Sequence, residues 1–342
     1  MRAVVYSRYG DSSVLDEVER PVPEPGEGEV RVRVAVSGVN PTDWKARVGG
    51  YGRELAEPTV PNHDGAGVVD AVGSGVEGVR VGDRVWMTLA GDGRPGSGTA
   101  QESTVVPAGR VFPLPAGASF ELGASVGIPG VTAHRALSVI EDGPSRLGPG
   151  ALDGRSILVA GGAGAVGNAA IQLARWSGAT VIATVSGEEK GALAAAAGAH
   201  HVVNYREGDP AGRIRGLAPD GIDLVVEVAP AGNSELDLAV LRQAGTVSIY
   251  ASEPGRPFTV DVPRGMRQNV RYQFVLLYTM GWDRIGAAAE DLNRAVEDGA
   301  YRVGDDAGLP LHRFPLEETG AAHDAVENGA VGKVLVTLAA DE

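Results

Sequence analysis

The sequence predicts an α/β protein in which a β-barrel-like region is followed by a doubly wound parallel sheet. Up to about residue 125, short β-type runs are broken by Gly and Pro, and residues 30–36 alternate apolar with mostly polar side chains. From about residue 127, short apolar runs alternate with helical stretches, a pattern typical of a parallel sheet covered on both faces. The length of 342 residues accommodates both parts, because it corresponds to about two domains.

The individual elements follow from the apolar runs and the turn residues between them. In the first region we expect strands at residues 30–36, 67–73 and 83–87. Residues 141–154 are rich in Gly and Pro without periodicity, which indicates a surface insertion. In the second region the expected strands are 157–160, 180–185, 201–204, 222–228 and 246–250, the helical stretches are 166–176, 190–197 and 285–297, and a last strand covers 333–338.

Composition excludes several classes of function. The chain carries 30 basic and 44 acidic residues, a formal net charge of −14, which argues against nonspecific binding to nucleic acid or to anionic membranes. It contains no cysteine, so disulfides, a cysteine nucleophile and cysteine-ligated zinc are excluded. The N-terminus opens into a strand-like run without the apolar core of a signal peptide, and no apolar stretch reaches the length of a membrane span. We therefore expect a soluble, cytoplasmic protein.

A glycine-rich motif carries the strongest functional signal. Gly162, Ala163, Gly164, Ala165, Val166 and Gly167 form a complete G-x-G-x-x-G between the apolar run 157–160 and an amphipathic helical stretch. In this pattern the first glycine permits a tight turn, the second lets the backbone approach a pyrophosphate, and the third lets the helix pack on the sheet. The helix N-terminus then offers unpaired N–H groups to the anion. The motif predicts dinucleotide binding, the alternative being an ordinary strand-to-helix turn.

The end of the second predicted strand indicates which dinucleotide binds. Enzymes that use NAD usually place Asp or Glu there, whereas this chain continues Val185, Ser186, Gly187. Lys190 follows within one helical turn and is able to neutralise a 2′-phosphate, so NADPH is expected in preference to NADH. In the alternative reading, Ser186 and Glu189 form a capping box and Lys190 is only solvated.

Several further segments, taken in order, carry a resemblance to a known family. They are G-V-N-P-T-D at 38–43, N-H-D-G-A-G at 62–67, G-D-R-V at 82–85, P-G-V-T-A at 129–133 and G-K-V at 332–334. Together they resemble the medium-chain dehydrogenase/reductase superfamily, and in particular its zinc-free branch of zeta-crystallin-like NADPH:quinone oxidoreductases. Zinc alcohol dehydrogenases carry a ligand cysteine in the first of these segments, where this chain has Asn40 and Pro41. The resemblance covers nearly the whole chain.

This resemblance implies an architecture and an assembly. A GroES-like β-barrel catalytic domain would occupy residues 1–126, a Rossmann NADPH-binding domain residues 127–275, and a C-terminal return completing the catalytic domain residues 276–342. Relatives of this kind often form homodimers through the edge of the nucleotide-binding sheet. Residues 246–251 would make a suitable edge strand.

The resemblance also implies roles for single residues. Lys190 matches the lysine that binds the 2′-phosphate, and Ser186 lies in the loop around that phosphate. Tyr205 matches a tyrosine near the adenosine end, and Thr132 would lie near the nicotinamide. Phe274 and Leu276 belong to a segment whose backbone meets the carboxamide. The substrate pocket would be lined by Asn40, Asp43 and Tyr51.

The chemistry expected of these residues is modest, because the cofactor supplies the hydride. Asn40 and Tyr51 are candidate donors to the oxygen that gains negative charge, although Asn40 would serve equally as a turn residue before Pro41. Asp43 would orient Tyr51 or Lys45, or form a surface salt bridge with Lys45. The proton would come from such a group or from water.

One residue departs from the superfamily's sequence pattern, and its neighbour stands where some relatives bind zinc. Asn62 replaces a glycine that usually precedes the histidine of the second segment. His63 stands where some relatives have a zinc ligand, but without cysteine partners we interpret it as structural and expect no metal site.

The resulting interpretation is a zinc-independent oxidoreductase that passes hydride from NADPH to a small-molecule quinone or similar activated carbonyl. A second possibility is an NADPH-dependent reductase of enal, enone or enoyl-thioester double bonds. A third, from another class, is a non-catalytic NADPH-binding protein. A zinc alcohol dehydrogenase is a distant fourth.

Overall fold

The computed structural model describes residues 1–52, 55, 57–253 and 255–338, and the chain divides into two compact units. Unit 1 consists of Met1–Ile128 and Leu311–Glu342, and unit 2 of Pro129–Pro310. We had expected the chain to return to the first domain at residue 276. The structure differs from this expectation, because residues 276–310 group with the second unit.

Hydrogen bonds explain why this segment stays with unit 2. Helix α8 (Trp282–Glu297) and the turn after it are hydrogen-bonded to helix α2 (Phe120–Leu137) and to helix α3 (Ala165–Trp176). The bonds are His134 Nε2 to Asp291 Oδ2 (2.8 Å), Trp176 Nε1 to Asp298 Oδ2 (3.0 Å), Gln172 Nε2 to the Arg302 carbonyl (3.0 Å) and Asn168 Nδ2 to the Ala307 carbonyl (2.7 Å).

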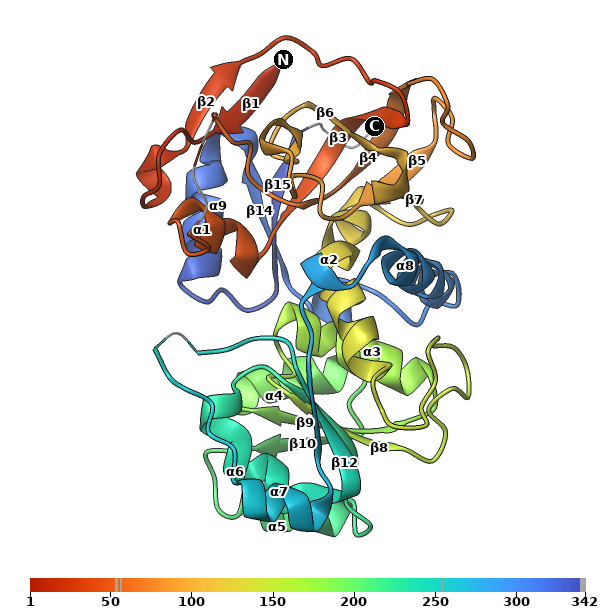
Figure 1. Cartoon of the computed structure of the whole chain (residues 1–342), viewed down its shortest axis with the longest axis vertical. Helices are drawn as coiled ribbons and strands as arrows, with labels where there is room; N and C mark the ends of the chain where they lie inside the picture. Colours follow the sequence, from red (N-terminus) through yellow and green to blue (C-terminus); the bar gives the residue numbers. More distant parts are fainter. Residues whose placement is uncertain (53–54, 56, 254, 339–342) are drawn as a thin grey trace. The chain divides into compact units, whose positions relative to one another are not determined.

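Unit 1 is built mainly from antiparallel strands, as the front of the sequence predicts (Figure 1). Its strands are β1 (Arg2–Val5), β2 (Asp16–Glu19), β3 (Glu29–Val39), β4 (Asp64–Val72), β5 (Arg84–Met87), β6 (Ser103–Pro107), β7 (Val111–Pro113), β14 (Leu311–Pro315) and β15 (Lys333–Thr337). Its helices are α1 (Pro41–Arg47), α9 (Thr319–Glu327) and the first half of α2 (Phe120–Leu137).

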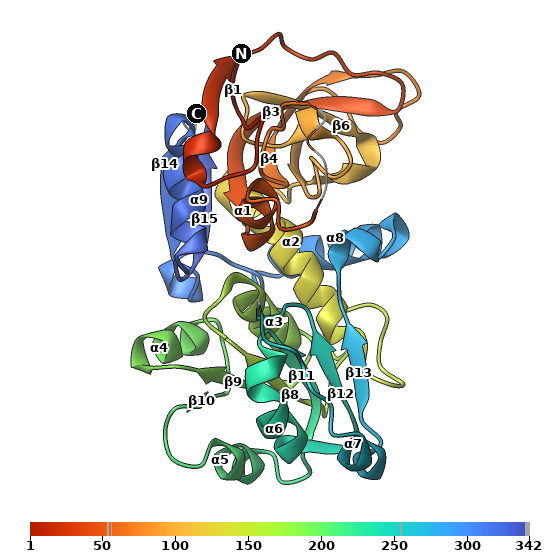
Figure 2. The same cartoon turned by 60° about the vertical axis from the view of Figure 1, so that its left-hand side comes forward.

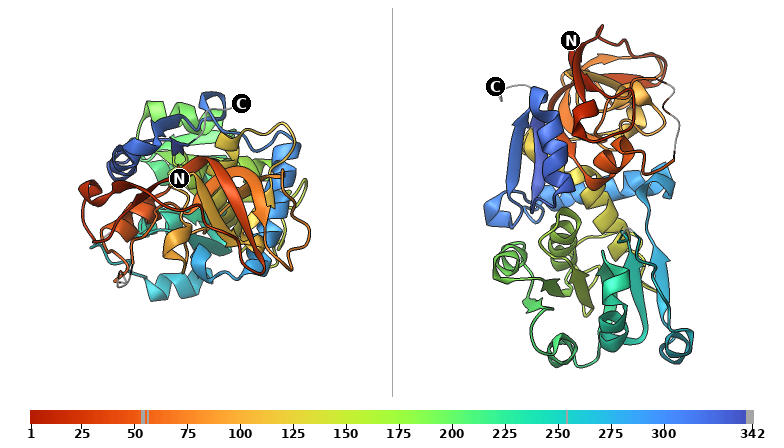
Figure 3. Two further views of the ribbon diagram at one scale, coloured as in Figure 1. Left: turned by 90° about the horizontal axis from the view of Figure 1, so that it is seen from above. Right: turned by 90° about the vertical axis from the view of Figure 1, so that its left-hand side faces the viewer.

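The main sheet of unit 1 runs β14-β15-β3-β4-β5-β7, with β6 also paired to β3. Strand β3 confirms the predicted alternation: Val30, Val32 and Val34 are buried in the core, while Arg31 and Arg33 are not fully buried. Strand β15 pairs antiparallel with β3, so the chain's last strand completes the sheet begun by its first hundred residues. Figure 3 shows α9 and β15 beside the N-terminal elements of this unit.

Unit 2 contains the predicted parallel sheet (Figure 2). The strand order is β10-β9-β8-β11-β12-β13. Strands β9 and β10 follow on one side of β8, and strands β11 to β13 follow on its other side, which is the doubly wound Rossmann order. The strands are β8 (Ser156–Ala160), β9 (Thr180–Val185), β10 (His201–Asn204), β11 (Ile222–Glu227), β12 (Leu241–Ile249) and β13 (Arg271–Phe274). The remaining helices are α4 (Glu188–Ala196), α5 (Pro210–Leu217), α6 (Pro230–Val240) and α7 (Val262–Gln268).

The edge strand of this sheet is not the one that we expected. Residues 246–251 fall largely in β12, which pairs with β11 on one side and with β13 on the other, so that assignment was wrong. The polar alternation of Arg271–Phe274 is weak evidence for a strand by itself, but the four residues extend the sheet beside β12. A homodimer formed through the sheet edge stays a prediction, and β13 is the strand at that edge.

Within the part of the chain that the structure describes, no helix has both the length and the apolar character needed to cross a membrane.

Candidate dinucleotide and substrate sites

The glycine motif of unit 2 forms a tight turn between β8 and α3. Gly161 has a φ of +69°, and the backbone N–H groups of Gly161 and Gly162 both donate to the Thr184 carbonyl at 3.1 and 3.2 Å. Gly164 N–H donates back to the Gly161 carbonyl at 3.0 Å. These bonds fix the loop to β9 and turn the chain directly into the helix.

The three glycines of the motif differ in why they are needed. A Cβ at Gly162 would lie 2.9 Å from the Ala183 Cβ, and a Cβ at Gly167 would lie 2.3 Å from the Gly161 carbonyl oxygen. Both glycines are therefore required by packing alone. A Cβ at Gly164 would meet nothing closer than the Gly161 carbonyl oxygen at 3.5 Å, which is ordinary contact. The fold does not need a glycine at Gly164, whereas a ligand that approaches the backbone there does.

The start of α3 is suited to an anion. Gly164 is the N-cap with extended backbone (φ −80°, ψ 163°), so no side chain caps the helix and its first turn carries no acidic residue. The first N–H groups of a helix have no partner within it, and the helix dipole places partial positive charge at the same point. A dinucleotide's pyrophosphate is the ligand that such a turn commonly holds.

The end of β9 matches the expected 2′-phosphate region. Strand β9 ends at Val185 and no carboxylate follows it directly. Lys190 lies in the first half of α4, is exposed, and makes no hydrogen bond or ion pair with any residue that the structure describes. The capping-box alternative is wrong, because the N-cap of α4 is Gly187 rather than Ser186 and no side chain caps it.

Three of the other expected cofactor residues lie at the carboxyl edge of the sheet, and the fourth, Thr132, lies in α2. Tyr205 follows β10, is 41% exposed, and its N–H donates to the Val185 carbonyl at 3.1 Å. Phe274 ends β13 and Leu276 follows it, 65% and 57% exposed. Thr132 is buried in α2. Their contacts with a cofactor stay predictions.

In unit 1 the expected substrate residue Asn40 lies in a buried ionic cluster. Its side chain is 2% exposed: Nδ2 donates to Asp64 Oδ2 at 2.8 Å, and Oδ1 accepts from Lys333 Nζ at 2.7 Å. Lys333 Nζ lies 3.8 Å from Asp64 Oδ2. Asp64 further accepts from Thr88 Oγ1 (2.8 Å) and from the Ile128 N–H (2.9 Å). The amide of Asn40 is thus held between an ammonium and a carboxylate.

Burial sets the electrostatics of this cluster. It raises the pKa of Asp64 and lowers that of Lys333, and the opposite charge of each partner counteracts both shifts. Burial also raises the pKa of Asp43 to about 8, helped by the negative charge of Asp64 and opposed by the hydrogen bond from the Asn40 N–H. The positive charge of Lys333 thus lowers the pKa of both carboxyl groups, against the effect of burial.

The structure corrects the expected surroundings of Asp43 and Tyr51. Asp43 is buried rather than on the surface, and its Oδ2 accepts from the Asn40 N–H at 2.7 Å, not from Lys45 or Tyr51. Tyr51 is 53% exposed, and its hydroxyl lies 3.1 Å from Thr42 Oγ1. The Tyr51 hydroxyl can still donate a hydrogen bond to a substrate oxygen. Asp43 instead accepts a hydrogen bond from the backbone at the start of α1.

Asn62 shows why a glycine is usual at its position. Its φ is +71°, in the left-handed region that favours glycine and tolerates asparagine. The asparagine adds a function, because its Nδ2 donates to Ser37 Oγ at 3.0 Å and its Oδ1 lies 2.9 Å from His323 Nε2. The substitution joins the β3 strand to α9 within unit 1. Among the described residues no three His, Cys, Asp or Glu side chains are grouped so as to hold a metal ion.

Sequence reasoning missed the partners of Asn40. Asp64 and Lys333 belong to two of the matching segments, but their separation from Asn40 in the sequence does not indicate that they contact it. The one indication of this contact was Lys333 itself, the first residue of the otherwise apolar predicted strand 333–338. When both faces of a strand are covered, even its first side chain lies in the core.

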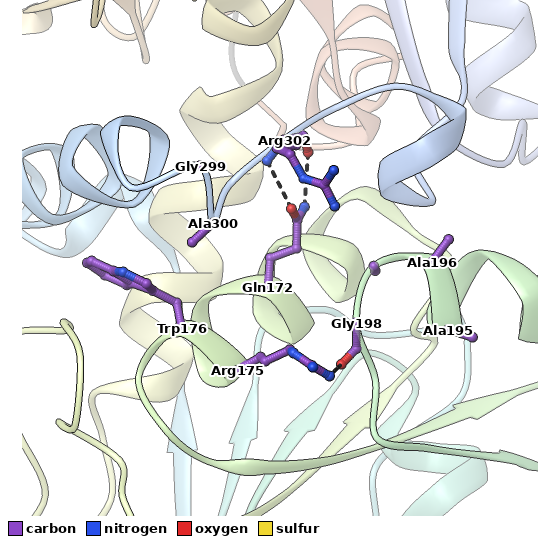
Figure 4. Close-up of a pocket in the computed structure, with 10 residues that line it drawn as sticks. Gln172, Arg175, Trp176, Ala195, Ala196, Gly198, Gly299, Ala300 and Arg302 are labelled. Carbon is purple, nitrogen blue, oxygen red and sulfur yellow. Dashed lines mark hydrogen bonds between the residues drawn. The ribbon is translucent and has the colours of Figure 1, made fainter.

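A surface pocket of about 490 Å³ lies at the C-terminal end of α3, at the opposite end of that helix from the glycine motif (Figure 4). The side chain of Gln172 holds both backbone groups of Arg302, accepting from its N–H (2.9 Å) and donating to its carbonyl (3.0 Å). None of the expected site residues lines this pocket, which is formed by Gln172, Arg175, Trp176, Ala195, Ala196, Ala197, Gly198, Gly299, Ala300 and Arg302.

Comparison with known proteins places these features in one family. Residues 26–116 match the alcohol dehydrogenase GroES-like domain, and residues 165–294 match the zinc-binding dehydrogenase family. The quinone oxidoreductase of Lama guanicoe is 33% identical over 99% of this chain and 98% of its own length. A mycobacterial protein solved in complex with NADPH has a TM-score of 0.82 at 31% identity, with 99% of this chain and 100% of that chain covered. An NAD-dependent alcohol dehydrogenase structure has a TM-score of 0.83 at 30% identity, with the same coverage.

These matches confirm the resemblance that the motifs indicated, including the GroES-like and Rossmann parts. Identity of about a third over the full length of both chains is sufficient to assign the family. The chain belongs to the quinone oxidoreductase family of the medium-chain dehydrogenase/reductase superfamily and is a nicotinamide-dinucleotide-dependent oxidoreductase.

Proposed function

We propose that this protein is an NADPH-dependent reductase that transfers hydride to a quinone or a similar activated carbonyl compound. The observation that carries the proposal is the glycine motif, in which Gly164 is open on the side where a side chain would project although the fold does not require a glycine there. The relatives support both parts of the proposal, because the relative from Lama guanicoe is named quinone oxidoreductase and a structural neighbour was solved with NADPH.

The residues present fit NADPH. The uncapped start of α3 would hold the pyrophosphate, and its first turn contains no acidic side chain that would repel the anion. Lys190, with Ser186 beside it, would hold the 2′-phosphate, and Tyr205 would pack near the adenosine end. Because β9 is not followed by a carboxylate, nothing at its end would select the 2′-hydroxyl of NADH.

The remaining roles concern the reacting end. Thr132, Phe274 and Leu276 would hold the nicotinamide, which when bound supplies the hydride. The hydride carries two electrons and one proton to the quinone, and one further proton completes the hydroquinone. The Tyr51 hydroxyl would donate a hydrogen bond to the acceptor oxygen as negative charge develops there. Asn40, held by Lys333 and Asp64, would present its amide in a fixed orientation.

A panel of acceptors tests this proposal against the alkene-reductase alternative. Oxidation of NADPH at 340 nm would be followed with 1,4-benzoquinone, 9,10-phenanthrenequinone, an enal and an enoyl thioester. We expect turnover of the quinones. Turnover of the enal or thioester alone would replace the proposed acceptor by an activated double bond, and NADPH binding without turnover of any acceptor would favour a binding role.

Replacement of Lys190 tests the choice of cofactor. A charge-assisted contact to a phosphate contributes about 1.5–3 kcal/mol, so Lys190→Ala should raise the KM for NADPH by roughly 10- to 100-fold and leave the KM for NADH nearly unchanged. Initial rates with each cofactor and one quinone give both values. Lys190→Arg, which keeps the charge, is the matched control. Equal effects on NADPH and NADH would show that Lys190 does not contact the 2′-phosphate.

A further inference from the structure

Two buried carboxyl groups meet at the carboxyl end of β11 in unit 2. Glu227, the last residue of that strand, is 0% exposed, and Asp237 on α6 is 3% exposed. Asn233 Nδ2 donates to Glu227 Oε1 at 3.0 Å, and Asp237 follows Asn233 by four residues on α6, so the helix presents both residues on the same face toward Glu227. Two ionised carboxylates cannot share a hydrogen bond, because neither has a donor, and buried like charges repel strongly. Close approach of these two buried carboxyl groups is therefore favoured when they hold one proton between them.

The carboxylate oxygens of Glu227 also accept hydrogen bonds from the segment that follows β11. Its Oε1 accepts from the Ala229 N–H, and Asn233 Nδ2 donates to Oε1 and Oε2 at 3.0 and 3.2 Å. Ala229 is the N-cap residue of α6 and offers no side-chain cap of its own. Glu227 thus fixes the segment 228–233, which consists of the two residues after β11 and the first turn of α6 and which we call the β11 loop.

The β11 loop lies against the start of the phosphate-binding turn. A Cβ placed on Gly161 would be 3.1 Å from Val228 Cγ1, which puts the Val228 side chain beside the residue that immediately precedes the glycine motif. Strands β8 and β11 are neighbours in the sheet at the point where the strand order reverses. Ligands of doubly wound sheets bind at that point, outside the carboxyl ends of the strands.

The groups that face the pair do not supply a compensating charge. Tyr250, after β12, is half-buried, and the charge of Glu227 adds to the effect of burial in raising its pKa. Tyr272 on β13 faces Asp237, with Asp261 and Arg264 of the α7 region beyond it. Glu253 accepts from the Gly232 N–H and pairs with Arg256. Among the described residues no lysine or arginine is hydrogen-bonded to either carboxyl, and burial raises the pKa of both.

We propose that Glu227 and Asp237 share one proton, and that this protonated pair is a positioning device which holds the β11 loop against the phosphate-binding turn for the dinucleotide. Glu227 then acts as a positioning residue rather than a catalytic one. The predicted effect on cofactor binding rests on the proposed function, that is, on the binding of NADPH. The shared proton itself does not depend on that proposal.

The shared proton is tested without any cofactor, by unfolding the chain in denaturant between pH 6 and 9. The folded pair holds a proton that the unfolded carboxyls, with ordinary pKa values near 4, have lost in this range. Stability contributed by the pair is therefore complete at low pH and is lost as pH rises. In Asp237→Asn the amide donates the hydrogen bond and no proton is needed. The ratio of wild-type to Asp237→Asn folding constants should fall about tenfold per pH unit while the folded pair keeps its proton.

The comparison is selective for this pair. The raised pKa of Asp43 affects wild type and variant equally and cancels in the ratio. Glu235→Gln is the matched control, because Glu235 lies on the same helix, is exposed, and pairs only with Arg264 among the described residues. It should follow the wild-type pH dependence. A ratio of wild-type to Asp237→Asn constants that does not change with pH would overturn the shared proton.

The positioning role is tested by fluorescence titration with NADPH at pH 7.5. Glu227→Ala removes the acceptor for Ala229 and Asn233 and should raise the Kd for NADPH about tenfold or more. Glu227→Gln keeps a carbonyl acceptor and gains a donor toward Asp237, so it should bind within about threefold of wild type, as should Glu235→Gln. If Glu227→Ala does not fold, Asp237→Ala, which leaves Glu227 ionised and without its partner, takes its place with the same expectation.

The outcomes separate this inference from the proposed function. If wild type binds no NADPH while the pH-dependent ratio appears as expected, the proposed function fails and the shared proton stands. If wild type binds NADPH and both the Glu227→Ala and Asp237→Ala variants bind it equally well, the positioning role is overturned.

Discussion

Gly164→Val is expected to abolish binding of NADPH and NADH alike while the chain stays folded. The Cβ of residue 164 has room in the structure, with its nearest neighbour at 3.5 Å, so the side chain would not disturb the turn. It would instead occupy the space through which a pyrophosphate reaches the N–H groups at the start of α3. Loss of two charge-assisted hydrogen bonds, at about 1.5–3 kcal/mol each, weakens binding by roughly 100-fold or more.

Two neighbouring variants make the interpretation specific. Gly164→Ala adds a single methyl group and should weaken binding much less than Val. Gly167→Ala should lower stability even without cofactor, because its Cβ would lie 2.3 Å from the Gly161 carbonyl oxygen. Titration by NADPH fluorescence measures binding, and thermal melting by circular dichroism measures folding. Normal NADPH binding by a folded Gly164→Val protein would show that the phosphate loop has been misplaced.

Lys333→Met is expected to lower the free energy of unfolding by about 3–5 kcal/mol. Lys333 is the one ammonium that the structure places against Asp64 and Asn40, and removal of one partner from a buried ion pair leaves an uncompensated charge. Denaturant unfolding at pH 7.5 gives the value. The Asn40 amide would lose the donor that fixes its orientation, so quinone turnover should fall together with stability.

The pH dependence of Lys333→Met provides an independent check. Without the ammonium, Asp64 and Asp43 are both buried beside each other, and their folded-state pKa values rise further above the unfolded values near 4. Protonation then favours the folded state, so the stability deficit should shrink as pH falls from about 8 toward 5. Adding Asp64→Asn to Lys333→Met should recover part of the loss. A deficit below about 1 kcal/mol, or one independent of pH, would show that the cluster is not held by this charge balance.

The dinucleotide half of the site was predictable because its information is local. The glycine motif occupies six consecutive residues, is preceded by a buried strand and opens a helix, and each part constrains the next. The missing carboxylate after β9 and the nearby Lys190 are likewise readable within a few residues. The capping-box alternative was wrong for an equally local reason, because the N-cap of α4 is Gly187 rather than Ser186.

The remaining features depend on contacts between residues far apart in the sequence. Lys333 reaches Asn40 across 293 positions, and no periodicity in either segment encodes that contact. Strand β13 forms because β12 offers it a partner, which is why residues 246–251 were mistaken for an edge. The second domain boundary was placed too early for a similar reason: α8 begins after residue 276 but is bound to α2 and α3 through Asp291 and Asp298.

The most direct test of the account is a hydride-transfer measurement with purified protein, 1,4-benzoquinone and NADPH deuterated at C4 of the nicotinamide on one face or the other. Direct transfer predicts protein-dependent oxidation of NADPH at 340 nm with one hydroquinone formed per NADPH consumed. It also predicts a slower rate with one of the two deuterated cofactors and an unchanged rate with the other. Absence of turnover, or turnover with no rate difference for either deuterated cofactor and no dependence on Gly164, would contradict the account.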